Sequence, residues 1–163
     1  MLDNETLALA KKVNDRLLIA GHVMVTAESC TGGLVAAALT SVAGASSILY
    51  GGFITYANEA KTAMIGVPAD LIDRHGAVSQ QVARAMAKGA RKTANVDLAI
   101  AITGIAGPGG GSETKPIGLV HFGLATAEGT VDRVERFGDL GRDHIRQEAV
   151  RVALETILEA YAP

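Results

Sequence analysis

Two apolar segments of the chain are joined by a short polar stretch, Ala27-Glu28-Ser29-Cys30-Thr31-Gly32-Gly33. An apolar run over 22–26 precedes this stretch, and the alanine-rich run 34–39 follows it. The order predicts a strand over 22–27, a tight turn, and a helix over 32–42. Such a turn places a small hydroxyl at a strand end, beside the unpaired N–H groups of a helix N-terminus. A nucleophile needs that access, and an anion needs those donors.

The rest of the chain alternates between helix and strand patterns. Helices are predicted over 3–20 (ending at Gly21), 58–65 (capped by Asn58), 68–76, 80–93 (capped by Ser79) and 142–160. Strands are predicted over 48–56 and 98–103, and a hairpin over 117–127 and 131–137. The pattern predicts an α/β protein in which residues 1–163 form a single three-layer α/β/α domain with a mixed, mainly parallel sheet.

Composition narrows the class of protein. The net charge is -2 with dispersed Lys and Arg, which argues against a nucleic-acid surface. One cysteine excludes an internal disulfide, and the four histidines lack metal-ligand spacing, so we expect neither a metal nor a cofactor. No apolar run has membrane-spanning length and no leader is evident, which predicts a cytoplasmic protein with no membrane partner. The alanine-rich helices favour a homo-oligomer.

Ser29 is the first candidate nucleophile, although a serine at this place is also a common helix cap. If Thr31 caps the helix instead, the Ser29 hydroxyl is available. Cys30 would be the stronger nucleophile as a thiolate, but a lone cysteine is most often a small buried apolar residue. Glu28 is either an acid or base at the site or an exposed turn residue. Gly32 and Gly33 would bring backbone N–H groups close to a ligand.

Lys61 is the candidate base for that serine. With Asn58 at the N-cap, Lys61 falls in the first turn of its helix, where the helix dipole disfavours a cation and lowers its proton affinity. Burial would lower the pKa further, and a lysine so perturbed can accept a proton at neutral pH. The alternative is a solvated surface lysine. Tyr56, at the preceding strand end, could relay a proton or orient a substrate, although packing is its commoner use.

A second glycine cluster, 104–112, follows the central strand, where sites of α/β proteins tend to lie. It has neither the P-loop ending nor the dinucleotide-binding spacing. The segment 104–116 is long for a loop in a compact domain, which favours a functional loop over a merely flexible one. Gly104 and Gly107 would let a ligand approach the backbone closely, and Thr103 could add a hydroxyl to the same pocket.

Arg142 and Arg146 are four residues apart at the start of the last helix and therefore share a face. Positive charge there opposes the helix dipole unless an anion is bound between the two side chains, and a phosphate would meet that need. Solvated arginines are the alternative.

Taken together, five blocks of the sequence resemble the CinA C-terminal domain family, in the expected order and over essentially the whole chain. The blocks are 26–33, 52–61, 75–79, 103–112 and 115–118. Stand-alone members of that family are nicotinamide-nucleotide amidohydrolases, and longer members carry an additional N-terminal domain.

The resemblance implies hydrolysis of nicotinamide mononucleotide to nicotinate mononucleotide and ammonia by a serine–lysine amidase. Ser29 matches the nucleophile and Lys61 the base, while Tyr56 and Thr103 match the pocket. Arg142 lies near the position of a Gly-Asp-Arg motif, which here reads Gly138-Asp139-Leu140-Gly141-Arg142. A nucleotide-binding module without catalysis is the alternative function.

Overall fold

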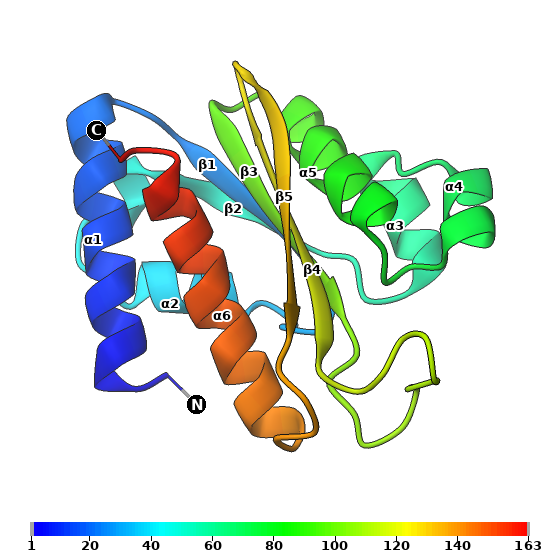
Figure 1. The fold of residues 1–163 in the computed structure, drawn as a ribbon. Helices are drawn as coiled ribbons and strands as arrows, with labels where there is room; N and C mark the ends of the chain where they lie inside the picture. Colours follow the sequence, from blue (N-terminus) through cyan, green and yellow to red (C-terminus); the bar gives the residue numbers. More distant parts are fainter. Residues whose placement is uncertain (1, 163) are drawn as a thin grey trace.

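A computed structural model describes residues 2–162, which form six α-helices, one short 3-10 helix and five strands (Figure 1). In chain order the elements are α1 (Asn4–Ala20), β1 (Met24–Glu28), α2 (Leu34–Thr40), η1 (Ala45–Ser47), β2 (Leu49–Ile54), α3 (Asn58–Ile65), α4 (Ala69–His75), α5 (Gln80–Ala94), β3 (Leu98–Gly104), β4 (Leu119–Thr126), β5 (Gly129–Arg136) and α6 (Arg142–Glu159).

The five strands form one mixed sheet in the order β2-β1-β3-β4-β5. β1 pairs in parallel with both β2 and β3, whereas β4 is antiparallel to β3 and β5 is antiparallel to β4. Four of the five strands therefore run in the same direction, and β4 alone is reversed. The mixed α/β sheet predicted from the sequence is confirmed.

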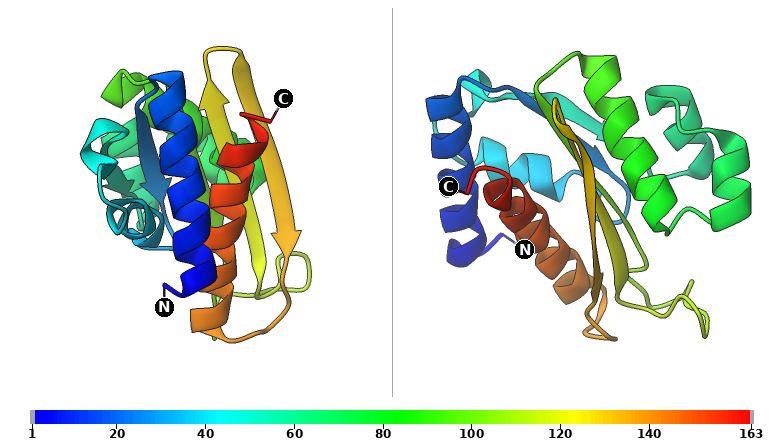
Figure 2. Two further views of the ribbon diagram at one scale, coloured as in Figure 1. Left: turned by 90° about the vertical axis from the view of Figure 1, so that its left-hand side faces the viewer. Right: turned by 45° about the horizontal axis from the view of Figure 1, so that its top comes forward.

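Helices cover both faces of the sheet, which completes the predicted three layers. α1, α2 and α6 lie on one face, and α3, α4 and α5 lie on the other (Figures 1 and 2). Alternation along β3 supplies both cores: Ile100 and Ile102 pack with the first group of helices, and Ala99 and Ala101 with the second. All four side chains are completely buried, as expected for a central strand.

Small residues on the second face let α5 approach the sheet closely. A Cβ atom at Gly123 of β4 would lie 2.3 Å from the carbonyl oxygen of Ala83 in α5. Gly89 of α5 similarly faces the carbonyl of Ile65 at the end of α3, where a Cβ atom would come within 1.8 Å. Both glycines are therefore required by packing, because any side chain would separate α5 from its neighbours.

Most of the helix boundaries agree with the sequence signals. Gly21 ends α1 in the left-handed conformation, and the Ser79 hydroxyl accepts a hydrogen bond from the N–H of Val82 at the start of α5. The capping role expected for Asn58 is wrong: Ala57 occupies the N-cap of α3 without a side-chain bond, and Asn58 is the first helical residue. Among the described residues, no helix is long and apolar enough to cross a membrane.

Candidate active site

The candidate residues gather where the parallel strands end. β1 lies between β2 and β3, so the segments that follow these three strands meet at one edge of the sheet. Ser29 follows β1, Thr55 and Tyr56 follow β2, and the glycine-rich loop follows β3. β1 and β3 are more than 70 residues apart in the chain, yet they pair as neighbouring strands of the sheet.

The turn after β1 depends on two glycines and one carboxylate. Gly32 and Gly33 have φ values of 61° and 99°, a region that side chains with a Cβ atom rarely adopt. The Glu28 carboxylate accepts hydrogen bonds from the N–H groups of Gly33, Val35 and Ala36 at 2.9 to 3.1 Å. Glu28 thus caps α2 across the turn. The sequence had suggested Ser29 or Thr31 for this capping role.

Because the Glu28 side chain is completely buried and its oxygens face the helix, the interpretation of this residue as an exposed turn residue is wrong. Its carboxylate is committed to three backbone donors, so the structure gives Glu28 a structural role, and the expected part in the site as an acid or base has no support from its contacts. The negative charge at the start of α2 is stabilised by the helix dipole as well as by the three donors.

Replacing Glu28 by glutamine is expected to destabilise the protein by about 1–3 kcal/mol, because an amide cannot accept from donors on both of its ends. Denaturant unfolding of Glu28→Gln and the wild type would measure the difference. Glu113→Gln, which alters an exposed carboxylate in the loop after β3, is the matched control. Equal free energies of unfolding for the two variants would contradict the capping role.

Ser29 and Lys61 lie within hydrogen-bonding distance of each other. The Nζ atom of Lys61 is 3.2 Å from the Oγ atom of Ser29, and it also donates to the carbonyl oxygens of Thr55 and Tyr56 at 2.9 and 3.2 Å. Lys61 is 1% exposed, and no carboxylate pairs with it among residues 2–162. A lysine buried in this way is a candidate base and not a surface cation.

Burial lowers the pKa of Lys61, because the charged amine loses its hydration and the attraction of the Glu59 carboxylate offsets only part of that loss. A neutral amine has two N–H groups and one lone pair. The two backbone carbonyls take the two N–H groups, so the lone pair is left facing the Ser29 hydroxyl. This is the orientation that removal of the Ser29 proton requires.

Two backbone N–H groups of the turn, those of Cys30 and Thr31, have no acceptor within the part of the chain that the structure describes. The Gly32 N–H donates to the carbonyl oxygen of Ser29 at 3.0 Å, and that of Gly33 donates to Glu28. The N–H groups of Gly32 and Gly33, which the sequence suggested would face a ligand, are therefore already used within the turn. The N–H groups that are available belong to Cys30, directly after Ser29, and to Thr31.

Arg146 fixes the direction in which the Thr31 N–H points. Its Nε atom donates to the Cys30 carbonyl at 3.0 Å, and its Nη2 atom donates to the Thr31 carbonyl at 3.2 Å. In a trans peptide the C=O and the next N–H point in opposite directions. By holding the Cys30 carbonyl, Arg146 turns the Thr31 N–H away from itself. Arg146 is thus a positioning residue for the turn.

Cys30 is unsuited to act as the nucleophile. Its side chain is 5% exposed and belongs to the core beneath α1, α2 and α6. Burial raises the pKa of the thiol to about 12, so the thiolate is not formed near neutral pH. The apolar role that the sequence favoured for Cys30 accounts for its position.

Arg142 joins the segments that follow β2 and β3. Its guanidinium donates to the Gly107 carbonyl at 2.8 Å and to the Tyr56 hydroxyl at 3.0 Å. Tyr56 is 58% exposed, so its ring forms an open side of the site while its backbone carbonyl holds Lys61. Arg142 is also exposed, and a guanidinium has five N–H donors, so several are left for an anionic substrate.

The comparisons with known proteins cover nearly the whole chain. The model of the CinA C-terminal domain matches residues 6–161. The chain belongs to the CinA C-terminal domain family. The nicotinamide-nucleotide amidohydrolase PncC of Escherichia coli K12 is 48% identical over 163 residues, covering 99% of this chain and 98% of that protein. The family resemblance carried by the five sequence blocks is confirmed.

Two further relatives show how this CinA domain occurs. The crystal structure of the competence/damage inducible protein CihA from Agrobacterium tumefaciens is 43% identical, with a TM-score of 0.97 and 99% of each chain covered. A CinA-like protein of Mycolicibacterium vanbaalenii is 50% identical over 151 residues, but the match covers only 36% of that longer chain. The CinA domain is therefore found both alone and as part of larger proteins.

Two residues expected in the pocket of this CinA domain have structural roles instead. The Thr103 hydroxyl donates to the Ala77 carbonyl at 2.8 Å and is 1% exposed, so it braces β3 against the segment before α5. A Cβ atom at Gly104 would lie 2.7 Å from the Val120 side chain, so this glycine serves the contact with β4. These packing contacts account for Thr103 and Gly104 within the chain, and the substrate contacts expected of them stay a prediction.

Lys115 is a residue that sequence reasoning missed. Its amine donates to the His75 carbonyl and ties the loop after β3 to the end of α4. The block 115–118 marked the segment, but nothing in it indicated an acceptor forty residues away in the chain. Among residues 2–162, no group of three or more acidic, histidine or cysteine side chains is arranged to hold a metal ion.

Proposed function

We propose that this protein hydrolyses the carboxamide of nicotinamide mononucleotide, giving nicotinate mononucleotide and ammonia by a serine–lysine mechanism. The observation that carries the mechanism is the 3.2 Å separation between the Ser29 hydroxyl and the buried Lys61 amine. The identity of the substrate is supported by the full-length similarity to a nicotinamide-nucleotide amidohydrolase.

In the first half of the reaction, neutral Lys61 accepts the Ser29 proton as the serine oxygen forms a bond to the carboxamide carbon. The positive pyridinium ring of the substrate makes that carbon electrophilic. The N–H groups of Cys30 and Thr31 stabilise the negative oxygen of the tetrahedral intermediate. When the intermediate collapses, the carbon–nitrogen bond breaks and Lys61 returns the proton to the leaving ammonia.

In the second half, a water molecule attacks the acyl-enzyme and Lys61 accepts one of its protons. The ester bond to Ser29 breaks, the serine oxygen regains a proton from Lys61, and nicotinate mononucleotide leaves. The same lysine thus serves as base and acid in turn, because its two carbonyl acceptors keep it aimed at the Ser29 oxygen throughout.

The phosphate of the substrate is expected to bind on the Arg142 side of the site. Arg142 is the more exposed of the two arginines, whereas Arg146 is committed to the carbonyls of the turn. The Tyr56 ring, held by Arg142, offers a flat apolar surface for the pyridinium ring. We place this reaction in the cytoplasm.

Ammonia release from nicotinamide mononucleotide by the purified protein is the direct test of this function. Turnover is expected without an added cofactor, and isothermal calorimetry under the same conditions would measure binding. Tight binding of the nucleotide without any ammonia would favour the alternative, a nucleotide-binding module in which Ser29 and Lys61 only hold the ligand. Turnover would exclude that alternative.

A further inference from the structure

A cavity of about 310 Å³ lies between the helices of the first face, next to the start of α2. Helices α1, α2 and α6 contact one another on this face (Figure 1). The apolar part of the lining includes Leu2, Leu34 and Val150, and the charged part is formed by Asp143 and Arg146. Its volume is at the lower end of the range for small-molecule sites. The cavity is therefore large enough for a small molecule, and it offers both apolar surface and charge.

Arg146 uses only one edge of its guanidinium within the chain. Its Nε and Nη2 atoms, which form that edge of the planar group, donate to the carbonyl oxygens of Cys30 and Thr31. A guanidinium has five N–H groups, so the two on Nη1 and one on Nη2 are left, and these form the second edge. No carboxylate lies within 4 Å of Arg146 among residues 2–162. An edge of this shape can bind a carboxylate through two parallel hydrogen bonds.

Asp143 supplies the opposite charge on the same side of α6. It precedes Arg146 by three residues, a spacing at which helical side chains are neighbours and can form an ion pair. Neither residue takes part in an ion pair within the described part of the chain, although both line the cavity. The cavity therefore has one positive and one negative group on its wall, and together they carry no net charge.

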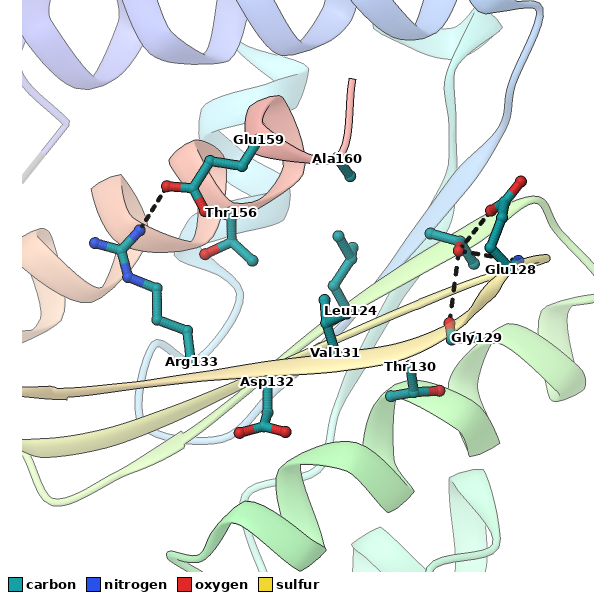
Figure 3. Close-up of a pocket in the computed structure, with 11 residues that line it drawn as sticks. Leu124, Glu128, Gly129, Thr130, Val131, Asp132, Arg133, Thr156, Glu159 and Ala160 are labelled. Atoms are coloured by element: carbon teal, nitrogen blue, oxygen red, sulfur yellow. Dashed lines mark hydrogen bonds and ion pairs between the residues drawn. The ribbon is translucent and has the colours of Figure 1, made fainter. Parts of the chain in front are cut away.

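A larger groove of about 590 Å³, between β5 and the C-terminal half of α6, differs from this cavity in the state of its charges. Figure 3 shows Arg133 of β5 directed toward Glu159 of α6, and an ion pair of 3.2 Å joins the two side chains. Arg133 also pairs with Glu135 and Glu155 at 2.8 and 3.6 Å. The Arg133 charge is thus balanced within the chain, whereas the two charges at the cavity beside α2 are available to a ligand.

We propose that this cavity beside α2 binds a small apolar α-amino acid in its zwitterionic form. The carboxylate of the amino acid accepts two hydrogen bonds from the Nη1 and Nη2 atoms of Arg146, and its ammonium group pairs with the Asp143 carboxylate. Its apolar side chain lies against Leu2, Leu34 and Val150. A zwitterion suits the cavity because it brings an opposite charge to each of the two unpaired groups, whereas a simple anion or cation would leave one of them unpaired.

The bound amino acid is expected to act on the catalytic turn through Arg146, which positions the Thr31 N–H by holding the Cys30 carbonyl. The ligand occupies the second edge of the guanidinium and leaves both bonds to the turn in place, so it restricts the motion of Arg146. A turn that is ordered in advance stabilises the reacting amide better. We therefore expect kcat/KM for ammonia release to rise about fivefold, at the low end for coupled sites. This effect on the rate rests on the proposed function, but the binding does not.

Isothermal calorimetry with L-leucine is the first test, and saturable binding is expected. 4-Methylpentanoate lacks only the ammonium group of leucine, and 3-methylbutylamine lacks only the carboxylate, so each should bind at least about tenfold more weakly. Asp143→Asn should weaken the binding of leucine about tenfold and leave that of 4-methylpentanoate unchanged, because only leucine has an ammonium group to lose its partner. Asp73→Asn, which alters an exposed carboxylate on α4, is the matched control.

Ammonia release with and without leucine is the second test. Leucine should raise kcat/KM in the wild type and in Asp73→Asn. At the same concentration it should have a smaller effect on Asp143→Asn, whose rate without leucine should equal that of the wild type. Circular dichroism would verify that both variants are folded.

The absence of saturable leucine binding, equal affinities for the three compounds, or an unchanged leucine affinity in Asp143→Asn would each overturn the proposed site. Binding that leaves kcat/KM of the wild type unchanged would overturn its coupling to the turn. A protein that binds leucine as described but releases no ammonia would contradict the proposed function and support the amino-acid site, so the two failures are distinguishable.

Discussion

Ser29→Ala is expected to reduce ammonia release from nicotinamide mononucleotide at least ~10³-fold, since removal of a covalent nucleophile has effects of this size or larger in other enzymes. The Ser29 Oγ atom forms a hydrogen bond with the Lys61 amine and with no other group among the described residues. The backbone of the turn is held by Glu28, Arg146 and the glycines, none of which the substitution changes. The loss is therefore expected in the rate constant kcat.

Three measurements separate this effect from a loss of structure. The thermal midpoint of Ser29→Ala should lie close to that of the wild type, and calorimetry should still detect nucleotide binding. Ser46→Ala, which removes an exposed hydroxyl in η1, is the matched control and should retain full activity. Undiminished turnover by Ser29→Ala would refute the serine as nucleophile.

The approach of Ser29 to Lys61 could be predicted because it follows from topology. The turn after one parallel strand and the helix after its neighbour must meet at the same edge of a sheet. Local patterns also located the helices, because capping residues such as Gly21 and Ser79 act through bonds to residues nearby in the chain. These signals are short in range and are therefore visible in the sequence.

The roles of Glu28 and Arg146 could not be predicted in the same way. Glu28 caps α2 from the end of β1, and the sequence does not show whether its side chain folds back or points outward. The acceptors of Arg146 are carbonyls more than 100 residues away, and a backbone carbonyl carries no sequence signature. These contacts decide which N–H groups of the turn are free to face a ligand, which is why the sequence suggested Gly32 and Gly33 and did not indicate Cys30.

Lys61→Met is expected to lower kcat by ~10²–10⁴, the range typical for loss of a positioned general base. Methionine matches the length of the lysine stem and fits the apolar part of the site, but it cannot accept the Ser29 proton. Lys88→Met, which removes an exposed amine on α5, is the matched control. Turnover by Lys61→Met at the wild-type rate would remove Lys61 from the mechanism.

The pH dependence of the wild type tests the charge state of Lys61. Since burial lowers the pKa of the folded-state amine below its ordinary value of 10.5, the base should become available as the pH rises through that lowered pKa. The rate constant should rise over the same range in the wild type. The residual rate of Lys61→Met should lack this step.

The free energy of unfolding should also depend on the titration of Lys61, and it should increase with pH. Between the lowered folded pKa and 10.5, the unfolded chain binds more protons at Lys61 than the folded chain does, so the free energy of unfolding increases with pH in that range. Below the folded pKa both states are protonated, and the folded protein has a buried charge. Relative to Lys61→Met, the wild type should therefore gain stability as the pH is raised toward 10.5.

The pH at which the stability of the wild type begins to increase should coincide with the pH at the midpoint of the rate profile. Both values report the protonation of the Lys61 amine. Denaturant unfolding at several pH values, with Lys61→Met as the reference, would measure the first, and initial rates of ammonia release would measure the second. A stability difference that does not change with pH would show that the Lys61 amine titrates as an exposed lysine does. The lone pair would then be unavailable near neutral pH, and the proposed acyl transfer to Ser29 would have no base.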